Sequence, residues 1–247
     1  SRAHFQSGSA YWSFGEIMKK FKSFIAIVLC LAVLCLAGCG NNTPDEPITE
    51  QNLIYGQKFP VALYEDVTIE DCFLYSGEFP EDASYEPCEN VAALKVKNNG
   101  ENDIQLLRIK VTTDSKEMLF EITTLTAGST VTVLEKAKQT LAEGELITSF
   151  SGGNRADFQA KISLKEDIFL LQTHSKTINI KNISDKDIES DIYVYYKKKD
   201  SNGDFLGGIT FRTKAEGGIK AGEIKQLPAT NFNPEDSVVL FVDYAQQ

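Results

Sequence analysis

The sequence predicts an all-β protein built from two similar halves. Short runs rich in β-branched and aromatic residues recur along the chain, and Asn, Gly, Asp or Pro separate them. Many runs alternate apolar and polar positions, as strands with one buried face do. The third observation is an internal repeat, which gives both halves the same order of features. The strand-like runs lie at 91–96, 107–111, 131–134, 178–180, 192–196 and 238–242.

The repeat consists of three segments in the same order. Residues 94–104 align without a gap with residues 178–188, since both read apolar, polar, apolar, Lys-Asn, a polar turn and Asp-Ile. Leu-Thr-Ala-Gly at 125–128 matches Ile-Lys-Ala-Gly at 219–222. A strand-like stretch precedes the first block of each half, at 67–75 and at 162–171. One match could arise by chance, whereas three in the same order favour a duplication.

The order apolar-x-Val-Lys-Asn-x-Gly, a strand, then Leu-x-Ala-Gly resembles the bacterial immunoglobulin-like modules of the CARDB and FxLyD kind. Those families are β-sandwiches of secreted and surface proteins, without catalytic residues. The resemblance implies two tandem immunoglobulin-like antiparallel β-sandwich domains, at 54–160 and 161–247. The second half has Ile-Ser where the first has Asn99-Gly100, so its turn signal is weaker. The resemblance implies a fold and a setting, and it carries over no ligand.

The residues from Met18 to Cys39 resemble a bacterial lipoprotein signal. A basic segment follows Met18, an apolar run spans 24–37, and Leu-Ala-Gly-Cys at its end resembles the lipobox. The run is shorter than the roughly 20 residues that a membrane span needs. The resemblance implies cleavage of a signal peptide at 18–38 and a diacylglycerol on the sulfur of Cys39. An ordinary signal peptide or an uncleaved anchor is the alternative.

Residues 1–17 are predicted to be a non-native extension, because a signal peptide normally begins with its basic segment at the start codon. The three residues before Met18 can back-translate into a ribosome-binding sequence. The mature chain would then begin at Cys39. Its first part, 39–53, is polar and contains proline, which predicts a flexible tether.

The charge balance narrows the classes of partner. The whole chain has 25 basic and 35 acidic residues. Without the four basic residues and one acid of 1–38, the mature chain has 21 and 34, a net charge of −13. Such a surface repels phosphate backbones, so nucleic acid is not an expected partner. Attachment to the membrane would come from the acyl chains on Cys39.

Two cysteines remain in the mature chain beside the lipidated one, Cys72 and Cys88. An even pair in an oxidising compartment predicts a disulfide, and two free thiols are the alternative. A bridge closing a loop of about 15 residues could contribute roughly 3 kcal/mol. Redox or metal chemistry is not indicated, because the spacing is not CxxC and no His is near.

No motif predicts catalysis, a metal site or a cofactor. His174 lacks a recognisable nucleophile and orienting acid. Residues 200–204 begin like a calcium loop, but Phe211 occupies the position of its bidentate Glu, and the internal Asn-Gly predicts a hairpin instead. The alternating acids of 185–191 could bind Ca²⁺ weakly on a strand, or form a solvated edge. Two glycine pairs are typical of turns or bulges, at 152–153 and 207–208.

One predicted strand, 192–199, could carry a binding surface. Its apolar alternate positions are predicted to face the core, which would turn Tyr193, Tyr195 and Lys197 outward. Tyrosine gives a large contact area at a small entropic cost. Cross-strand packing that covers these side chains is the alternative.

These features predict a lipoprotein on the outer face of the cell membrane, in a bacterium with a single membrane. Its expected role is non-catalytic binding or scaffolding in the cell envelope. The expected partners are the membrane, through the lipid on Cys39, and an unknown protein or cell-wall ligand. A structural spacer or a subunit of an envelope assembly is the alternative, and an enzyme ranks third.

Overall fold

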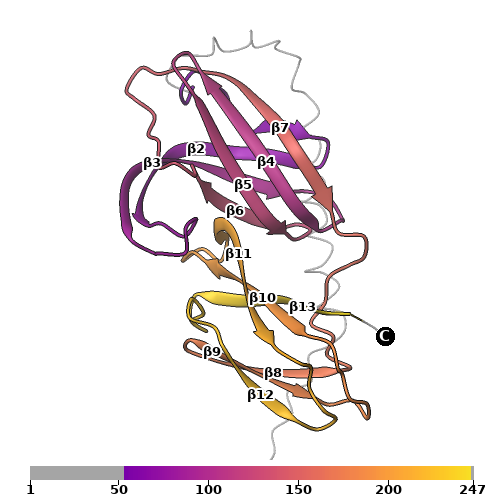
Figure 1. Ribbon diagram of the computed structural model, residues 1–247. Coiled ribbons are helices and arrows are strands. Elements are labelled where there is room, and N and C mark those ends of the chain that lie inside the picture. The colour runs from indigo at the N-terminus through magenta and orange to yellow at the C-terminus, as the bar shows by residue number, and fades with distance from the viewer. Residues whose placement is uncertain (1–52, 246–247) are drawn as a thin grey trace, which may run out of the picture. The chain divides into compact units, whose positions relative to one another are not determined.

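The computed structural model describes residues 53–245, which form strands and loops without a helix (Figure 1). This confirms the all-β prediction. The predicted extension at 1–17, the signal at 18–38, Cys39 and all of the tether before Leu53 lie outside the described residues. The described residues belong to one compact unit. Their strands are β1 Val61–Tyr64, β2 Val67–Glu78, β3 Pro87–Asn98, β4 Ile104–Thr113, β5 Glu117–Leu125, β6 Thr130–Leu134, β7 Ile147–Asp157, β8 Phe169–His174, β9 Thr177–Asn182, β10 Ile192–Lys199, β11 Phe205–Ala215, β12 Ile224–Pro228 and β13 Ser237–Tyr244.

The strands form three sheets within 53–245. One sheet has seven strands in the order β1-β2-β3-β6-β11-β10-β13, and two have three strands each, β5-β4-β7 and β12-β9-β8. Neighbouring strands are antiparallel except β6 and β11, which are parallel. The strands β1 to β7 make up the first half of the described chain, and β8 to β13 the second half.

The two halves repeat one strand order. In β2 to β7, the first, second and fifth strands pair as β2-β3-β6, while the fourth, third and sixth pair as β5-β4-β7. In β8 to β13, the same positions pair as β8-β9-β12 and β11-β10-β13. Only β1, on the outer edge of the first half, has no counterpart among the described strands of the second half.

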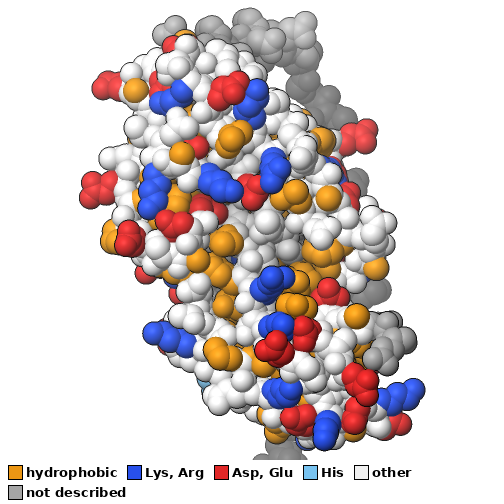
Figure 2. Space-filling view, viewed as in Figure 1, with side chains coloured by type: hydrophobic (Ala, Val, Ile, Leu, Met, Phe, Trp, Pro, Cys, Tyr) orange, Lys and Arg blue, Asp and Glu red, His pale blue; other side chains and the backbone are white. Residues whose placement is uncertain are grey.

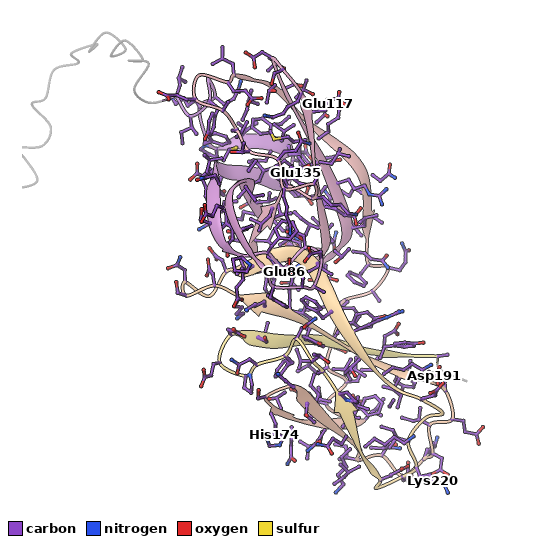
Figure 3. All side chains as sticks on the ribbon, turned by 60° about the vertical axis from the view of Figure 1, so that its left-hand side comes forward. Glu86, Glu117, Glu135, His174, Asp191 and Lys220 are labelled. Atoms are coloured by element: carbon purple, nitrogen blue, oxygen red, sulfur yellow. The ribbon has the colours of Figure 1, made fainter. Side chains whose placement is uncertain are left out.

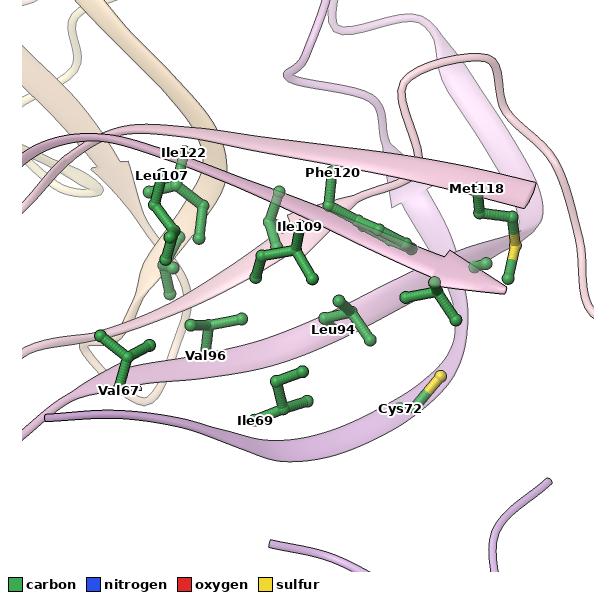
Figure 4. Packing of buried hydrophobic residues seen from close by; sticks show 14 of the residues in the cluster. Val67, Ile69, Cys72, Leu94, Val96, Leu107, Ile109, Met118, Phe120 and Ile122 are labelled. Carbon is green, nitrogen blue, oxygen red and sulfur yellow. The ribbon is translucent and has the colours of Figure 1, made fainter. Parts of the chain in front are cut away.

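Each half has its own hydrophobic core. In the first, alternate residues of β2 and β3 face alternate residues of β4 and β5, as Figure 4 shows for Ile69 and Leu94 opposite Ile109 and Phe120. These side chains are buried because only one face of each strand points inward. The second core includes an aromatic cluster, in which the Tyr196 ring stacks on Phe211 and meets Phe232 edge-on.

The repeated Lys-Asn sequence places one fully buried asparagine in each half. Asn98 Nδ2 donates to the carbonyls of Asn102 and Leu125, at 2.9 and 3.1 Å, and its Oδ1 accepts from the Gly100 N–H. Asn182 Nδ2 makes the equivalent bonds, to the carbonyls of Lys186 and Ile219 at 2.7 and 3.1 Å. A buried amide must satisfy its polar atoms, so the same residue type recurs at both positions.

The aspartates of the repeat also have equivalent roles. Asp103 Oδ1 accepts from the Ala127 N–H at 2.9 Å, and Asp187 Oδ1 accepts from the Ala221 N–H at 2.8 Å. The Ala-Gly sequence of each half therefore provides the N–H that binds this carboxylate. Asp187 and the other acids of 185–191 lie in a loop, not on a strand, so the alternative in which they share one strand face does not hold.

Cys72 and Cys88 are free, buried thiols, and the predicted disulfide is not formed. Cys72 pairs with Leu94 across β2 and β3, whereas Cys88 pairs with Gly77. Six residues of β3 separate Cys88 from the position opposite Cys72, about 20 Å along a strand. A disulfide needs Cα atoms within about 7 Å, so the alternative of two free thiols holds. The loop length alone did not reveal that the cysteines lie far apart on paired strands.

The predicted hairpin at Asn202-Gly203 is confirmed. β10 and β11 are antiparallel neighbours, and the Asp200 N–H donates to the Asp204 carbonyl at the turn. Gly203 has a φ of 88°, which glycine adopts without strain. The predicted strand at 162–171 is only partly present, because β8 begins at Phe169.

Candidate functional site: the junction between the halves

The two halves meet where β6 and β11 pair in parallel and join their sheets into one (Figure 1). Phe205 of β11 lies opposite Val131 of β6, and its side chain is part of the first core. Further along, β11 crosses the edge of β5, where the Thr210 N–H donates to Thr123 Oγ1 at 2.8 Å. Hydrophobic side chains also gather on the surface where the two halves meet (Figure 2).

Lys197 of β10 is fully buried at this junction. Its Nζ donates to the carbonyl oxygens of Thr123, Thr124 and Gly208, at 2.8, 3.2 and 2.9 Å. An ammonium has three N–H groups, so all of them are used. Two of the acceptors belong to β5 of the first half and one to β11 of the second. Lys197 therefore connects the halves by hydrogen bonds to the backbone.

This position corrects the prediction that Lys197 faces solvent. Lys197 lies on the same side of β10 as Tyr193 and Tyr195, as the alternation predicted, but β5 covers it. The strand pattern correctly indicated the side of the strand. It contained no information on which other element would pack there.

Glu81, from the loop between β2 and β3, reaches the same place from the first half. Its carboxylate accepts from the N–H groups of Leu134 at 2.8 Å, Gly208 at 2.9 Å and Ile209 at 3.3 Å. Gly208 is thus held through both its backbone groups, since its N–H donates to Glu81 and its carbonyl accepts from Lys197 and from Thr123 Oγ1. We refer to these three residues as the Lys197–Gly208–Glu81 junction.

Glycine is required at two adjacent positions of this junction. A Cβ at Gly208 would overlap the carbonyl oxygen of Glu121, and one at Gly207 would lie 2.6 Å from Pro80 Cγ. Gly207 also has a φ of 85°. The register of β10 and β11 shifts here, so the interpretation of this pair as bulge glycines is confirmed.

Burial shifts the protonation of both charged groups. It lowers the pKa of Lys197 to about 7, against the attraction of the Glu81 carboxylate. It also raises the pKa of Glu81, although the N–H groups of Leu134 and Gly208 and the charge of Lys197 oppose this shift. Both directions follow from the removal of a charged group from water.

The loop that carries Glu81 also packs into the second half. Ala83 and Tyr85 lie against the second core, and the Tyr85 ring stacks on Phe211 with 6.0 Å between ring centroids. The Nζ of Lys198 lies 4.4 Å from the centroid of the Tyr85 ring and pairs with Glu78 at 2.6 Å. A loop of the first half therefore packs against the core of the second half.

The predicted tyrosine surface is largely covered by neighbouring side chains. Tyr195 stacks on Phe241 of β13, with ring centroids 4.2 Å apart, and Phe158 meets Phe241 edge-on. The Arg212 guanidinium lies 5.1 Å from the centroid of the Tyr193 ring. Both tyrosines are half-buried, whereas Arg212 is exposed. This arrangement matches the alternative of cross-strand packing, with a guanidinium left on the surface.

A small cavity of about 180 Å³ adjoins the junction. One of its carboxylates, Glu121, is bound by Arg108 at 2.6 Å and by Lys136 at 3.6 Å. No nucleophile or base stands free beside it, so the arrangement has the chemistry of structural ion pairing. The lining residues are Glu81, Glu121, Thr123, Leu134, Lys136 and Ile209.

The remaining candidates do not come together. His174 is exposed at the end of β8, and Figure 3 places it well away from Glu86, which ends the loop at the junction. Within the described residues, no group of three or more His, Cys, Asp or Glu side chains is arranged to hold a metal ion. Residues 53–245 form no helix that could span a membrane.

No known protein family, characterised protein or solved structure is significantly similar to this chain.

Sequence reasoning missed Glu81, although two signals pointed toward the junction. Lys197 follows three alternate apolar positions on its predicted strand, and Gly207-Gly208 lies within the following strand. A glycine pair inside a strand often marks the close approach of another segment. Neither signal identifies Glu81, because its partners are backbone N–H groups of distant strands.

Proposed function

We propose that this chain is a lipid-anchored extracytoplasmic protein with a non-catalytic scaffolding or binding role in the cell envelope. The lipobox-like sequence at 36–39 supports the anchor.

We further propose that each half is an immunoglobulin-like sandwich. In immunoglobulin constant domains the first, second and fifth strands share one sheet, and the third and sixth share the other. Both halves of this chain have that partition. They differ in the fourth strand, which pairs with the third strand here, and in having six strands in the shared order.

The observation that carries the scaffolding role is the Lys197–Gly208–Glu81 junction. Neighbouring domains of one chain usually meet through modest polar surfaces and move relative to each other. Here a shared sheet, a fully buried lysine and a loop of the first half that packs against the second core connect the halves. Such a connection fixes the distance and direction between surfaces on the two halves, which is what a scaffold requires.

A structural spacer is the second candidate, and the same rigid junction favours it. A binding role is favoured instead by the exposed Arg212 on the face that carries Tyr193 and Tyr195. Among the described arginines, Arg108 and Arg155 are paired with carboxylates, and Arg212 forms no such pair. A guanidinium over an aromatic ring is a common recognition element.

The test is a crosslinking pull-down of the lipidated protein from intact native cells, with Cys39→Ser as the unanchored control. A binding scaffold should capture a discrete partner only in the anchored form. Arg212→Ala should weaken that capture several-fold, whereas Lys181→Ala, on a different sheet, should not. Recovery of bulk envelope alone would favour the spacer, and a Cys39 peptide without a diacylglycerol mass would contradict the anchor.

A further inference from the structure

Three large aliphatic side chains form an exposed group at one end of the first half. Leu53, Ile54 and Leu146 are 36, 39 and 51% exposed. The Leu146 segment lies beside the segment that carries Leu53 and Ile54, because the Ile147 N–H donates to the Tyr55 carbonyl at 2.9 Å. We call Leu53, Ile54 and Leu146 the aliphatic end group.

The side chain of Leu146 lies directly over the turn that follows Ile54. Ile54 and Gln57 exchange two backbone hydrogen bonds of 2.9 Å. A Cβ added to Gly56, between them, would lie 3.1 Å from Leu146 Cδ2. The turn also receives a side-chain bond, since Gln57 Nε2 donates to the Ile147 carbonyl at 2.7 Å. Hydrogen bonds therefore hold the turn after Ile54 against the segment that carries Leu146.

The aliphatic end group lies at the end of the first half that is opposite the junction. Asp114 lies in the turn between β4 and β5, and its N–H donates to the Leu146 carbonyl at 3.0 Å. The other end of β4 and β5 is near the junction, where Thr124 accepts from Lys197. The ten residues of β4 separate the two ends by about 30 Å.

The chain enters the described region at the aliphatic end group itself. Fourteen residues lead from Cys39 to Leu53. A chain of that length reaches at most about 50 Å. As the tether that its composition predicts, it would have a typical end-to-end distance of about 20 Å. A lipid on Cys39 would therefore hold these three side chains at high local concentration beside the membrane.

We propose that the aliphatic end group docks into the interfacial layer of the lipid bilayer, an inference that rests on the proposed lipid anchor. Three half-exposed aliphatic side chains bind a membrane weakly alone, but the anchor removes the need for independent affinity. Asp114, whose N–H donates to the Leu146 carbonyl, and Glu143, three residues before Leu146, are both acidic, so apolar insertion and not attraction to anionic lipid drives docking. The junction and the second half are then directed away from the bilayer.

The experiment uses the lipidated protein purified from membranes and placed in phosphatidylcholine vesicles that contain a lipid-borne quencher. An environment-sensitive dye is attached to Leu146→Cys or, as a matched control, to Ile224→Cys. Ile224 is 61% exposed on β12 of the second half. Cys72 and Cys88 should stay unlabelled, because burial raises the pKa of Cys72 to about 12 and raises that of Cys88.

Docking predicts quenching at position 146 that is at least threefold greater than at position 224. With the dye at Leu53→Cys, a second change of Leu146→Asp should abolish the excess quenching, and Ile224→Asp should leave it intact. Equal quenching at 146 and 224 in protein that floats with the vesicles would overturn docking and leave the anchor standing. If the purified protein carries no lipid on Cys39 and does not float with the vesicles, both the lipid anchor and the docking are overturned.

Discussion

Among the described residues, side chains form hydrogen bonds with backbone groups more often than with other side chains. Asn98 and Asn182 satisfy turn carbonyls inside the two halves. Glu81 binds three backbone N–H groups, and Lys197 binds three carbonyls. Removal of such a side chain leaves several polar groups without partners, so substitutions here have consequences well beyond one contact.

The first prediction concerns Lys197 and pH. The native pKa of about 7 lies below the ordinary 10.5, so between these values the unfolded chain binds more protons than the native protein. Stability should therefore rise with pH in this window, by up to about 1.4 kcal/mol per pH unit. In urea unfolding at pH 7, 8 and 9, Lys197→Met should lack this rise.

Lys181→Met is the matched control, because Lys181 lies on the outer face of β9. It should keep the wild-type dependence. The measurements stop at pH 9 because the buried Cys72 thiol contributes above its ordinary pKa of 9.0. Parallel curves for the wild type and Lys197→Met would show that the three carbonyls keep the ammonium charged in the native state.

The second prediction concerns Glu145, which is buried beside Leu146. Burial disfavours its charged form, but bonds from Thr113 Oγ1, the Ala142 N–H and Lys116 Nζ outweigh this and lower its pKa to about 2. The stabilisation is therefore present above pH 4.5 and is lost as pH falls toward 2.

Glu145→Gln should lower the unfolding free energy at pH 7 by about 1–3 kcal/mol. It should also remove part of the acid dependence between pH 4.5 and 2, measured by thermal unfolding. Glu117→Gln is the control, since the side chain of Glu117 is 60% exposed and pairs only with Lys110. Equal effects of the two changes would argue against the special role of Glu145.

At the scale of elements, glycine determines whether β11 can approach the first half. Gly208→Ala would force a Cβ against the Glu121 carbonyl, which is backbone and cannot rotate away. We expect a loss of at least about 2 kcal/mol in chemical unfolding. Gly203→Ala is the control, since an added Cβ there meets nothing within 4 Å and only the positive φ is strained. It should lose about 1 kcal/mol or less, and a similar loss for Gly208→Ala would mean that β11 shifts freely.

The sequence predicted those elements whose signals are local. The hairpin at 202–203 and the β-branched runs of β3, β6 and β10 follow from turn chemistry and alternation. β7 was missed because most of its side chains are exposed and Gly152-Gly153 interrupts its pattern. The disulfide and the position of Lys197 were wrong because both depend on long-range packing, which no local pattern contains.

At the scale of the whole described region, the halves share core residues as well as strands. Phe205 lies in the first core, and Val238 and Leu240 of β13 pack against it, although all three belong to the second half. Tyr85 of the first half packs on the second core. A half that unfolded alone would expose apolar surface of its neighbour, so unfolding of the two should be coupled.

Calorimetry tests this coupling directly. The wild type should unfold in one transition whose calorimetric and van't Hoff enthalpies agree. Glu81→Ala leaves the N–H groups of Leu134, Gly208 and Ile209 without their acceptor and should split the transition into two, with a loss of about 1–3 kcal/mol. Glu86→Ala, an exposed change at the end of the same loop, should keep one transition. Two transitions already in the wild type would mean that the halves are independent, and the scaffolding role would lose its main support.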